Sequence, residues 1–360
     1  MLVAAAVGAL IGGFTDLSVY RFAGGAVLDG SAVYGPDDPA TGLPFTYPPF
    51  AALALAPLAV LPEAVAAAVV TAATAGALAG SVALVLRELG RPGPGWQVAG
   101  LAAGSLSLEP VWQTLAFGQV NAVLMLVVLV DLLRPERRWS GVLLGLAAGV
   151  KLTPLGFVVL LLFVRRPAAA ARAVATFAAT VGVGLVLVAD GPSYWDDRLL
   201  DPRRVGPPEF AGNQSLLGSL ARLVDDVPGT WAWLAVALPV AAAGLGLAAY
   251  VWRGGDRVLG TCLAALALLL VSPMSWSHHW VWAVPLALAL WDRSRVAAVA
   301  WVAVFVARPI WWPDGAESRE YAWGAGQHLL GSGYVLAGLV LLAQMAWLAR
   351  GQAVRGSAPV

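Results

Sequence analysis

Cysteine and histidine are nearly absent from this chain, which has one cysteine and three histidines among 360 residues. The cysteine, Cys262, lies in an apolar run, so the chain can form neither an intrachain disulfide nor a cysteine-based metal cluster. The histidines have no clustered carboxylates beside them, and we expect no metal centre. The sequence also lacks a Walker loop, a GxGxxG motif at a strand-to-helix turn and a His-Glu-x-x-His helix. It therefore gives no support to ATP, nicotinamide or zinc-protease chemistry, and we expect no cofactor.

Charge is also scarce. Charged residues make up 12% of the chain and hydrophobic residues 59%, against about 25% and about 45–50% in a soluble domain. This excess of apolar residues is too large for a bigger soluble core and predicts a polytopic membrane protein. The formal net charge is +1, so no global field indicates nucleic acid as a partner. Lysine occurs once, at Lys151, among 22 basic residues, which draws attention to that position.

Apolar runs separated by short basic loops give the predicted topology. Residues 1–15 have no basic start, so we interpret them as a first transmembrane helix and not as a signal peptide. Cytoplasmic loops collect Lys and Arg, and the basic loops here are residues 134–138, 165–172, 252–257, 292–295 and 350–355. Counting from these loops predicts an all-α membrane protein with about 12 spans and both termini inside.

That count holds only if residues 51–62 do not cross the membrane. This apolar stretch is short for a span and contains Pro57 and Pro62, so we predict a re-entrant or interfacial helix. We expect one transmembrane domain over residues 1–360, with catalytic extracytoplasmic loops 16–62 and 190–228 and a cytoplasmic tail 350–360.

Several predicted helices are only about 11 to 14 residues long, which is at most roughly 20 Å at 1.5 Å per residue. Short or broken helices at membrane depth are tolerated where they line a protein-buried or watery cavity. They predict a cavity open to the outer leaflet, and they are residues 96–108, 120–133, 139–150, 154–164, 258–271 and 280–291.

Asp16 lies where the first apolar run ends, at the start of the long polar stretch 14–50. It can cap the helix that follows it, because Asp is a favoured N-cap residue. It can also act as a general base that takes a proton from an acceptor hydroxyl. Ionisable residues at membrane depth are costly and usually functional, which favours the second interpretation.

Lys151 separates two apolar half-helices within residues 139–164, a segment that must cross the membrane twice. A lysine at a helix end can simply extend its amine to the interface. Alternatively it is a phosphate partner, placed where the break exposes the N-terminus of the 154–164 helix, which itself favours an anion.

Two further polar segments interrupt the apolar runs. His278 and His279 lie in SPMSWSHHW, where a proton relay or phosphate-binding role competes with that of plain interface histidines. The segment Asn213-Gln-Ser215 matches a glycosylation sequon, which is a weak signal. We interpret it as a polar helix start that can hydrogen-bond a sugar.

Six motifs in order resemble glycosyltransferase family 87, the bacterial polyprenol-phosphate-mannose-dependent alpha-(1→2)-mannosyltransferases of the GT-C superfamily. No single motif is specific, but the resemblance covers nearly the whole chain. The motifs are Asp16-Leu-Ser-Val-Tyr20, Phe45-Thr-Tyr47-Pro48-Pro49, Gly118-Gln119-Val-Asn121, Gly145-Leu-Ala-Ala-Gly149-Val-Lys151-Leu-Thr-Pro154, Asn213-Gln-Ser215 and Ser272-Pro-Met-Ser-Trp276-Ser-His278-His279.

The resemblance implies a multi-pass plasma-membrane enzyme with an extracytoplasmic active site. It would transfer a hexose, mannose, with inversion from polyprenyl-phosphate-mannose to a mannose hydroxyl of a glycolipid or lipoglycan. It also implies that the acid of the first extracytoplasmic loop, Asp16, is the catalytic base, and that no metal is needed. We expect the donor's phosphate or sugar to be bound by Lys151, His278, His279, Arg21, Gln119, Asn121, Asn213 and Arg222. The chain before Asp16 is shorter than the family normally carries.

Two alternatives remain open at this point. The first is an arabinofuranosyltransferase that uses a decaprenyl-phosphate pentose, since related families share the scaffold. The second is a transporter or flippase of lipid-linked sugars. Transporters more often show repeats with broken helices in matching halves, whereas the long polar loops 16–50 and 190–228 differ in content.

Overall fold

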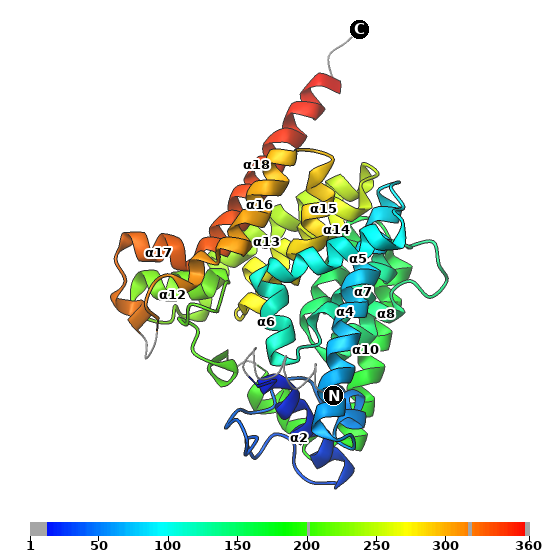
Figure 1. Cartoon of the computed structure of the whole chain (residues 1–360), viewed down its shortest axis with the longest axis vertical. Coiled ribbons are helices and arrows are strands. Elements are labelled where there is room, and N and C mark those ends of the chain that lie inside the picture. The colour runs from blue at the N-terminus through cyan, green and yellow to red at the C-terminus, as the bar shows by residue number, and fades with distance from the viewer. Residues whose placement is uncertain (1–12, 200–201, 316–318, 357–360) are drawn as a thin grey trace. The chain divides into compact units, whose positions relative to one another are not determined.

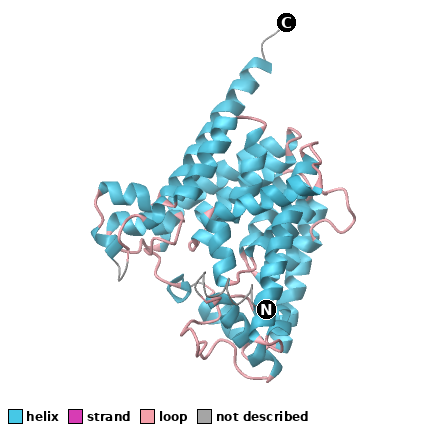
Figure 2. Cartoon of the chain, in the orientation of Figure 1, coloured by secondary structure: helices cyan, strands magenta, loops and turns pink. Residues whose placement is uncertain are grey.

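A computed structural model describes residues 13–199, 202–315 and 319–356. Regular structure in these residues is helical, apart from one isolated antiparallel bridge between Asn213 and Trp276 (Figure 2). The predicted all-α class is therefore confirmed for the part of the chain that is described. The predicted first helix, residues 1–15, lies almost entirely outside it.

The described residues form two compact units. Unit 1 comprises the chain up to Val158 together with Arg166–Pro207, and unit 2 comprises Val159–Arg165 together with the chain from Pro208 onward. The expectation of one transmembrane domain over residues 1–360 stays a prediction.

In unit 1, helices α4, α7, α8 and α10 pack side by side in that order (Figure 1). The short pair α3 and η1 packs against α2, and α3 also contacts α8 and α10. The elements of this unit are α2 (Thr15–Leu28), α3 (Pro49–Leu55), η1 (Ala56–Leu58), α4 (Glu63–Glu88), α5 (Gly95–Gly104), η2 (Ser105–Ser107), α6 (Glu109–Phe117), α7 (Asn121–Leu132), α8 (Val142–Val150), η3 (Thr153–Gly156), α10 (Pro167–Leu187), α11 (Gly191–Ser193), η4 (Tyr194–Arg198) and η5 (Pro202–Val205).

In unit 2, α13 packs along α14, which contacts α15, and α15 packs on α16. Helix α18 contacts α13, α14 and α16. The elements are α12 (Leu216–Val224), α13 (Thr230–Arg253), α14 (Arg257–Val271), η6 (Ser277–Trp282), α15 (Ala283–Trp291), α16 (Arg295–Ala307), η7 (Pro309–Trp311), η8 (Arg319–Ala322), α17 (Ala325–Gly331) and α18 (Gly333–Gly356). Helix α9 (Phe157–Phe163) falls at the division between the units.

Four helices of the described residues are long and apolar enough to cross a membrane, namely α4, α10, α13 and the Gly333–Arg350 part of α18. The pair α6 and α7, bent by 116°, makes a fifth if it counts as one broken span. The chain is thus an apolar helical protein of the multi-pass membrane type. The count of 12 spans and the topology stay predictions, because several of the predicted spans are short helices or are broken.

The predicted helix boundaries hold in some places and fail in others. The predicted short helices 120–133 and 258–271 are confirmed, as α7 and α14. The expectation that residues 16–50 form a loop is wrong for their first part, because α2 covers Thr15–Leu28. The loop predicted at 165–172 is also too long. Helix α10 starts at Pro167, since proline suits the first helical position and an alanine-rich run follows it.

The short apolar stretch predicted not to cross is a short helix in the structure. Helix α3 begins at Pro49 and continues into η1, and the chain enters α4 at Glu63. Ten residues, Pro49–Leu58, form this apolar helix, and about 20 are needed to span the hydrocarbon core. Its position relative to the membrane stays a prediction.

Candidate active site

The first turn of α2 places Asp16. Phe14 occupies the N-cap position in the left-handed conformation and provides no side-chain cap. Asp16 is therefore the second residue of the helix and not its cap. A carboxylate in the first turn of a helix is stabilised by the positive end of the helix dipole. The local structure thus holds an acid in a favourable position without using it as a cap.

The bend between α6 and α7 brings the Gly118-Gln119-Val-Asn121 motif against the start of α2. Gly118 ends α6 with φ of 69°, a left-handed conformation that glycine adopts without strain. A Cβ atom there would lie 2.8 Å from Cβ of Leu17, so only glycine permits this close approach. The Phe14 amide donates to the Ala116 carbonyl at 3.1 Å and fixes the contact.

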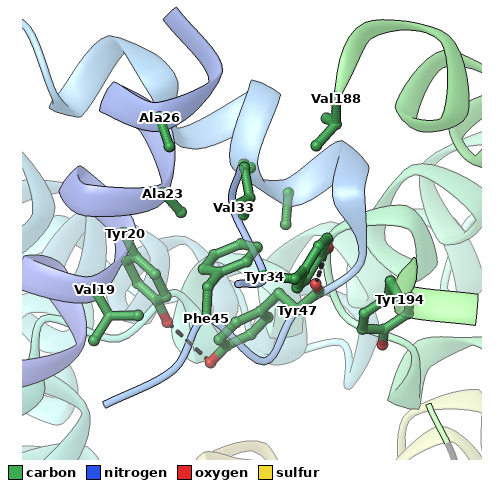
Figure 3. Packing of buried hydrophobic residues seen from close by; sticks show 12 residues of the cluster. Val19, Tyr20, Ala23, Ala26, Val33, Tyr34, Phe45, Tyr47, Val188 and Tyr194 are labelled. Carbon is green, nitrogen blue, oxygen red and sulfur yellow. Dashed lines mark hydrogen bonds between the residues drawn. The ribbon is translucent and has the colours of Figure 1, made fainter. Parts of the chain in front are cut away.

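Gln119 is the centre of a buried hydrogen-bond network. Its Oε1 accepts from the Tyr20 hydroxyl at 2.8 Å and from the Tyr47 hydroxyl at 3.1 Å, and the two hydroxyls lie 3.0 Å apart. Figure 3 shows the Tyr20 and Tyr47 rings directed toward each other, and the rings meet edge-on at 5.4 Å. The Gln119 side chain also hydrogen-bonds Asp16. Because Oε1 accepts from the tyrosines, the amide nitrogen is the Gln119 group that can donate to the carboxylate.

Lys151 lies at the break that separates α8 from η3, as the sequence predicts. Its Nζ donates to Oδ1 of Asn121 at 2.8 Å and lies 5.2 Å from the centre of the Tyr47 ring. Asn121 is the first residue of α7, so the ammonium is held beside the bend that carries Gln119. The sole lysine therefore belongs to the same cluster as Asp16.

The two charged groups of this cluster stabilise each other's charged forms. Burial raises the pKa of Asp16 to about 6, while the Gln119 hydrogen bond and the charge of Lys151 oppose the rise. Burial lowers the pKa of Lys151 to about 7, and the charge of Asp16 opposes that fall. Neither residue lies in a helix long enough to cross a membrane. Near neutral pH the site can hold a carboxylate base beside an ammonium, which is the pairing needed to deprotonate a hydroxyl and to neutralise a leaving phosphate.

An aromatic layer of three side chains, Tyr34, Phe45 and Tyr47, supports the cluster. The Tyr34 and Phe45 rings are 5.9 Å apart, and Phe45 lies 5.7 Å from Tyr47 (Figure 3). The Tyr34 hydroxyl donates to the Tyr47 carbonyl at 2.7 Å. Phe45 and Tyr34 thus hold Tyr47 in place, one by ring packing and the other by a hydrogen bond.

Asp190 anchors the same layer. Its two carboxylate oxygens accept from the Val33 amide at 2.9 Å and the Tyr34 amide at 2.7 Å. Sequence reasoning missed Asp190 and Tyr34, because about 157 residues separate the partners and neither stands in a recognisable local motif.

Arg21, predicted to bind the donor, has backbone partners in the structure. Its Nε donates to the Leu58 carbonyl at 3.1 Å and its Nη2 to the Leu61 carbonyl at 2.8 Å. These contacts tie α2 to the end of the short apolar helix. A role in donor binding stays a prediction for this residue.

In unit 2 the structure brings together two other motifs of the predicted site, Asn213-Gln-Ser215 and the segment that contains His278 and His279. An antiparallel bridge between Asn213 and Trp276 pairs them. The Gln214 amide donates to the Ser275 carbonyl and the Ser277 amide donates to the Gly212 carbonyl, each at 2.8 Å. Ser215 caps α12 by accepting from the Gly218 amide at 3.0 Å, so the predicted polar helix start is confirmed.

The Asn213 side chain is engaged within this pairing. Its Nδ2 donates to the Pro208 carbonyl at 2.9 Å and the Pro273 carbonyl at 3.2 Å, and its Oδ1 accepts from the Ser275 amide at 2.9 Å. The structure thus shows Asn213 joining two loops, and sugar binding by this residue stays a prediction.

Arg222 is fully buried in α12 and hydrogen-bonds the loop that precedes this helix. Its Nη1 donates to the carbonyls of Glu209, Phe210 and Asn213 at 3.1 to 3.3 Å. Its Nη2 donates to the Ser219 and Ser332 hydroxyls, each at 3.2 Å. These contacts account for its place in the fold, and phosphate binding by Arg222 stays a prediction.

His278 and His279 lie in η6 with their rings edge to face, 4.8 Å apart. His278 is buried and His279 is partly exposed. Their predicted contact with a donor phosphate stays a prediction. Among the side chains that the structure describes, no three of His, Cys, Asp or Glu come together in a way that could hold a metal ion.

The family model described as glycosyltransferase family 87 matches residues 45–273, which is more than half of the chain. The chain belongs to glycosyltransferase family 87. The matched region contains Tyr47, Gln119, Asn121 and Lys151 and begins downstream of Asp16. The chain is accordingly a glycosyltransferase.

Curated relatives extend the family 87 match to most of the chain. A polyprenol-phosphate-mannose-dependent alpha-(1-2)-phosphatidylinositol pentamannoside mannosyltransferase of Mycobacterium tuberculosis (strain CDC 1551 / Oshkosh) is 35% identical over 93% of this chain and 81% of the relative. The phosphatidylinositol mannoside mannosyltransferase of M. tuberculosis (strain ATCC 25618 / H37Rv) is 35% identical over 92% of this chain and 86% of its own length. A pentamannoside mannosyltransferase of Mycolicibacterium smegmatis is 36% identical over 93% and 85%. No solved structure matches this family 87 chain.

Proposed function

We propose that this enzyme transfers mannose, with inversion, from polyprenyl-phosphate-mannose to a mannose hydroxyl of a phosphatidylinositol mannoside. The relatives whose names specify this donor and this class of acceptor each align over about nine tenths of the chain. Their names favour mannose over the pentose alternative. Family membership favours transfer chemistry over the transport alternative.

The observation that carries the proposal is the placement of a general base beside a cation. Asp16 is hydrogen-bonded to the Gln119 side chain. Lys151 donates a hydrogen bond to Asn121 and lies over the Tyr47 ring. In the proposed step the acceptor oxygen attacks C1 of the mannose and its proton passes to the Asp16 carboxylate. A new C1–O bond forms as the bond from C1 to the phosphate oxygen breaks. Polyprenyl phosphate leaves with the bonding electron pair, and Lys151 stabilises the charge that develops on it.

The reaction is proposed to take place at the outer face of the plasma membrane. The apolar helices support membrane insertion, and the arginine-rich loops support an outer position for the segment that carries Asp16. A lipid-linked donor suits this arrangement, because its polyprenyl chain remains in the bilayer while its phosphate reaches the interface.

The test is an assay of purified protein in lipid vesicles with polyprenyl-phosphate-mannose and a phosphatidylinositol mannoside. Asp16→Asn keeps the shape of the side chain and removes its basicity. General bases contribute typically about 10²- to 10⁴-fold, so the rate of transfer should fall by that factor. Asp37→Asn, which neutralises an exposed acid of the same polar stretch, is the matched control and should retain activity.

Retained transfer by Asp16→Asn would exclude the base assignment. A parallel reaction with decaprenyl-phosphate-arabinose tests the sugar. Transfer of arabinose and not of mannose by the unaltered enzyme would overturn the proposed donor while leaving the transferase class intact.

A further inference from the structure

Two arginines that the predicted site does not include converge on one ring of the aromatic layer. The guanidinium carbon of Arg198 lies 5.9 Å from the centre of the Tyr34 ring, and that of Arg204 lies 5.6 Å from it. Both arginines come from the polar segment between α10 and α12. The predicted topology puts this segment on the outer side of the membrane. Arginines at aromatic faces keep their charge and present donors in a planar fork.

The ring between the arginines is held at both ends. The Tyr34 amide donates to Asp190, and the Tyr34 hydroxyl donates to the Tyr47 carbonyl. Arg204 also donates from Nη2 to the Phe45 carbonyl, which fixes its guanidinium beside the layer. Such a fixed framework positions charges with little loss of side-chain freedom on binding.

Arg198 lies at the end of a five-residue π-helical turn, Tyr194–Arg198, in which the Leu199 amide donates to the Tyr194 carbonyl at 3.0 Å. Turns of this kind are rare and frequently found at functional sites. The buried Nε of Arg198 has no hydrogen-bond partner among the described residues. The Arg198 side chain as a whole is only half-buried, so a ligand can reach its guanidinium group.

The charge near Tyr34 favours an anion. The charged groups that act on its hydroxyl are Arg198, Arg204 and Asp190. The two oxygens of Asp190 already accept the Val33 and Tyr34 amides. These three groups together carry one net positive charge.

We propose that Arg198 and Arg204 bind the phosphodiester of the lipid acceptor. The proposal rests on the proposed function, because it takes the acceptor to be a phosphatidylinositol mannoside. Arginine forks match phosphate oxygens in paired hydrogen bonds.

The donor's phosphate does not suit this position. It is bonded to the sugar carbon that reacts, so it must lie beside Asp16 and Lys151. The Tyr34 ring contacts the Phe45 ring, which in turn contacts the Tyr47 ring, with 5.9 Å and 5.7 Å between the ring centres. The acceptor's phosphate, by contrast, is separated from the reacting hydroxyl by sugar units. An anion site at the Tyr34 end of the aromatic layer fits the acceptor, because the other end, Tyr47, contacts Gln119 and Lys151.

The experiment compares two acceptors, a phosphatidylinositol mannoside and a neutral mannosyl glycolipid without phosphate, in neutral phosphatidylcholine vesicles. Arg198→Gln and Arg204→Gln should each raise KM for the phosphate-bearing acceptor by about tenfold, a typical value for one charge-assisted contact. KM for the neutral acceptor and KM for the donor should stay within about twofold. Arg198→Lys should recover part of the loss, and Arg138→Gln in an exposed basic loop is the control.

Several outcomes would overturn the proposal. An equal loss with both acceptors would mean that the arginines only support the loop. A change in KM for the donor alone would assign the site to the donor phosphate. A loss seen only in vesicles with added phosphatidylglycerol, whichever acceptor is used, would assign it to membrane headgroups.

A binding measurement separates this proposal from the proposed function. Retention of a radiolabelled phosphatidylinositol mannoside by the purified protein needs no transfer reaction. If the unaltered protein transfers no mannose yet binds this lipid through Arg198 and Arg204, the proposed reaction fails and the anion site stands. If Arg198→Gln and Arg204→Gln bind the lipid as well as the unaltered protein does, the anion site fails.

Discussion

At the scale of single residues, the chemistry depends on how one amide is oriented. Gln119 accepts from two tyrosine hydroxyls through its oxygen, which leaves its nitrogen for Asp16. The carboxylate is thereby kept ionised to a lower pH than burial alone would allow. The same cluster keeps Lys151 next to Tyr47 and Asn121. Asp16, the proposed base, and Lys151, the proposed phosphate partner, are thus positioned by neutral side chains.

The two shifted pKa values predict a narrow pH optimum. The pKa of Asp16 is raised to about 6, so the active carboxylate is lost as the pH falls through that value. The pKa of Lys151 is lowered to about 7, so the ammonium of the free enzyme is lost as the pH rises through 7. The value of kcat/KM should therefore be largest between about pH 6 and 7 and fall by about tenfold per unit on either side.

The profile of kcat provides a check on this assignment. A bound phosphate favours the charged form of Lys151, so the alkaline limb of kcat should lie at higher pH than that of kcat/KM. Lys151→Arg keeps its charge throughout and should remove the alkaline limb. A kcat/KM profile that stays flat from pH 5 to pH 9 would contradict both assignments.

At the scale of helices, small residues let α8 approach α10 closely enough to position Lys151. Gly141, Gly145 and Gly149 recur at every fourth position and face α10. A Cβ atom on Gly145 would lie 2.4 Å from the Ala173 carbonyl oxygen and 3.0 Å from the Phe177 amide nitrogen. These are backbone atoms, so they cannot rotate away. Close approach through small residues is a common way for apolar helices to associate.

We therefore expect Gly145→Ala to destabilise the protein. Forcing a methyl group into this contact should cost about 1–3 kcal/mol, and α8 should move away from α10. Both the apparent Tm in detergent and the rate of transfer should fall, because Lys151 directly follows α8. Gly182→Ala in α10 is the matched control. A Cβ atom there meets nothing within 4 Å, so the substitution should leave Tm unchanged or raise it. Equal effects of the two substitutions would show that packing at Gly145 is not the cause.

At the scale of the whole molecule, the topology decides which substrates can reach the site. Four long apolar helices are candidate membrane spans, and the bent pair α6 and α7 is a fifth if it counts as one span. The bend in that pair carries Gln119, and the break after α8 carries Lys151. Irregular backbone at membrane depth is tolerated where it lines protein or a watery cavity. The location of the active site on the outer face therefore needs a direct measurement.

The single cysteine makes that measurement simple. Cys262 is buried, and Cys262→Ala gives a background without thiols. In intact cells a membrane-impermeant maleimide should label a cysteine introduced by Asp37→Cys, and it should reach Arg138→Cys only after permeabilisation. Asp37 and Arg138 are both exposed, so a difference in labelling reports the side of the membrane. The reverse pattern would show that the arginine-based topology is inverted.

Local residue patterns determined the helical class of this protein and its family. Composition predicted an apolar helical chain, and six motifs in order predicted the family. Four of these motifs contain Asp16, Tyr47, Gln119 and Lys151, which belong to one cluster. Helices such as α4 follow from apolar runs of sufficient length, because their hydrogen bonds are local. The break at Lys151 was likewise readable, because a polar residue and a nearby proline interrupt an apolar run.

Only the tertiary structure decided which polar groups act together. The bonds of Asp190 to Val33 and Tyr34 join segments more than 150 residues apart, so no local pattern could reveal them. The structure also gave Asn213 and Arg222 backbone partners that the sequence could not predict. A buried polar group must satisfy its hydrogen bonds wherever the fold provides partners. Residue type and spacing therefore predicted which side chains can do chemistry, and long-range packing decided that Asp16 and Lys151 share one network.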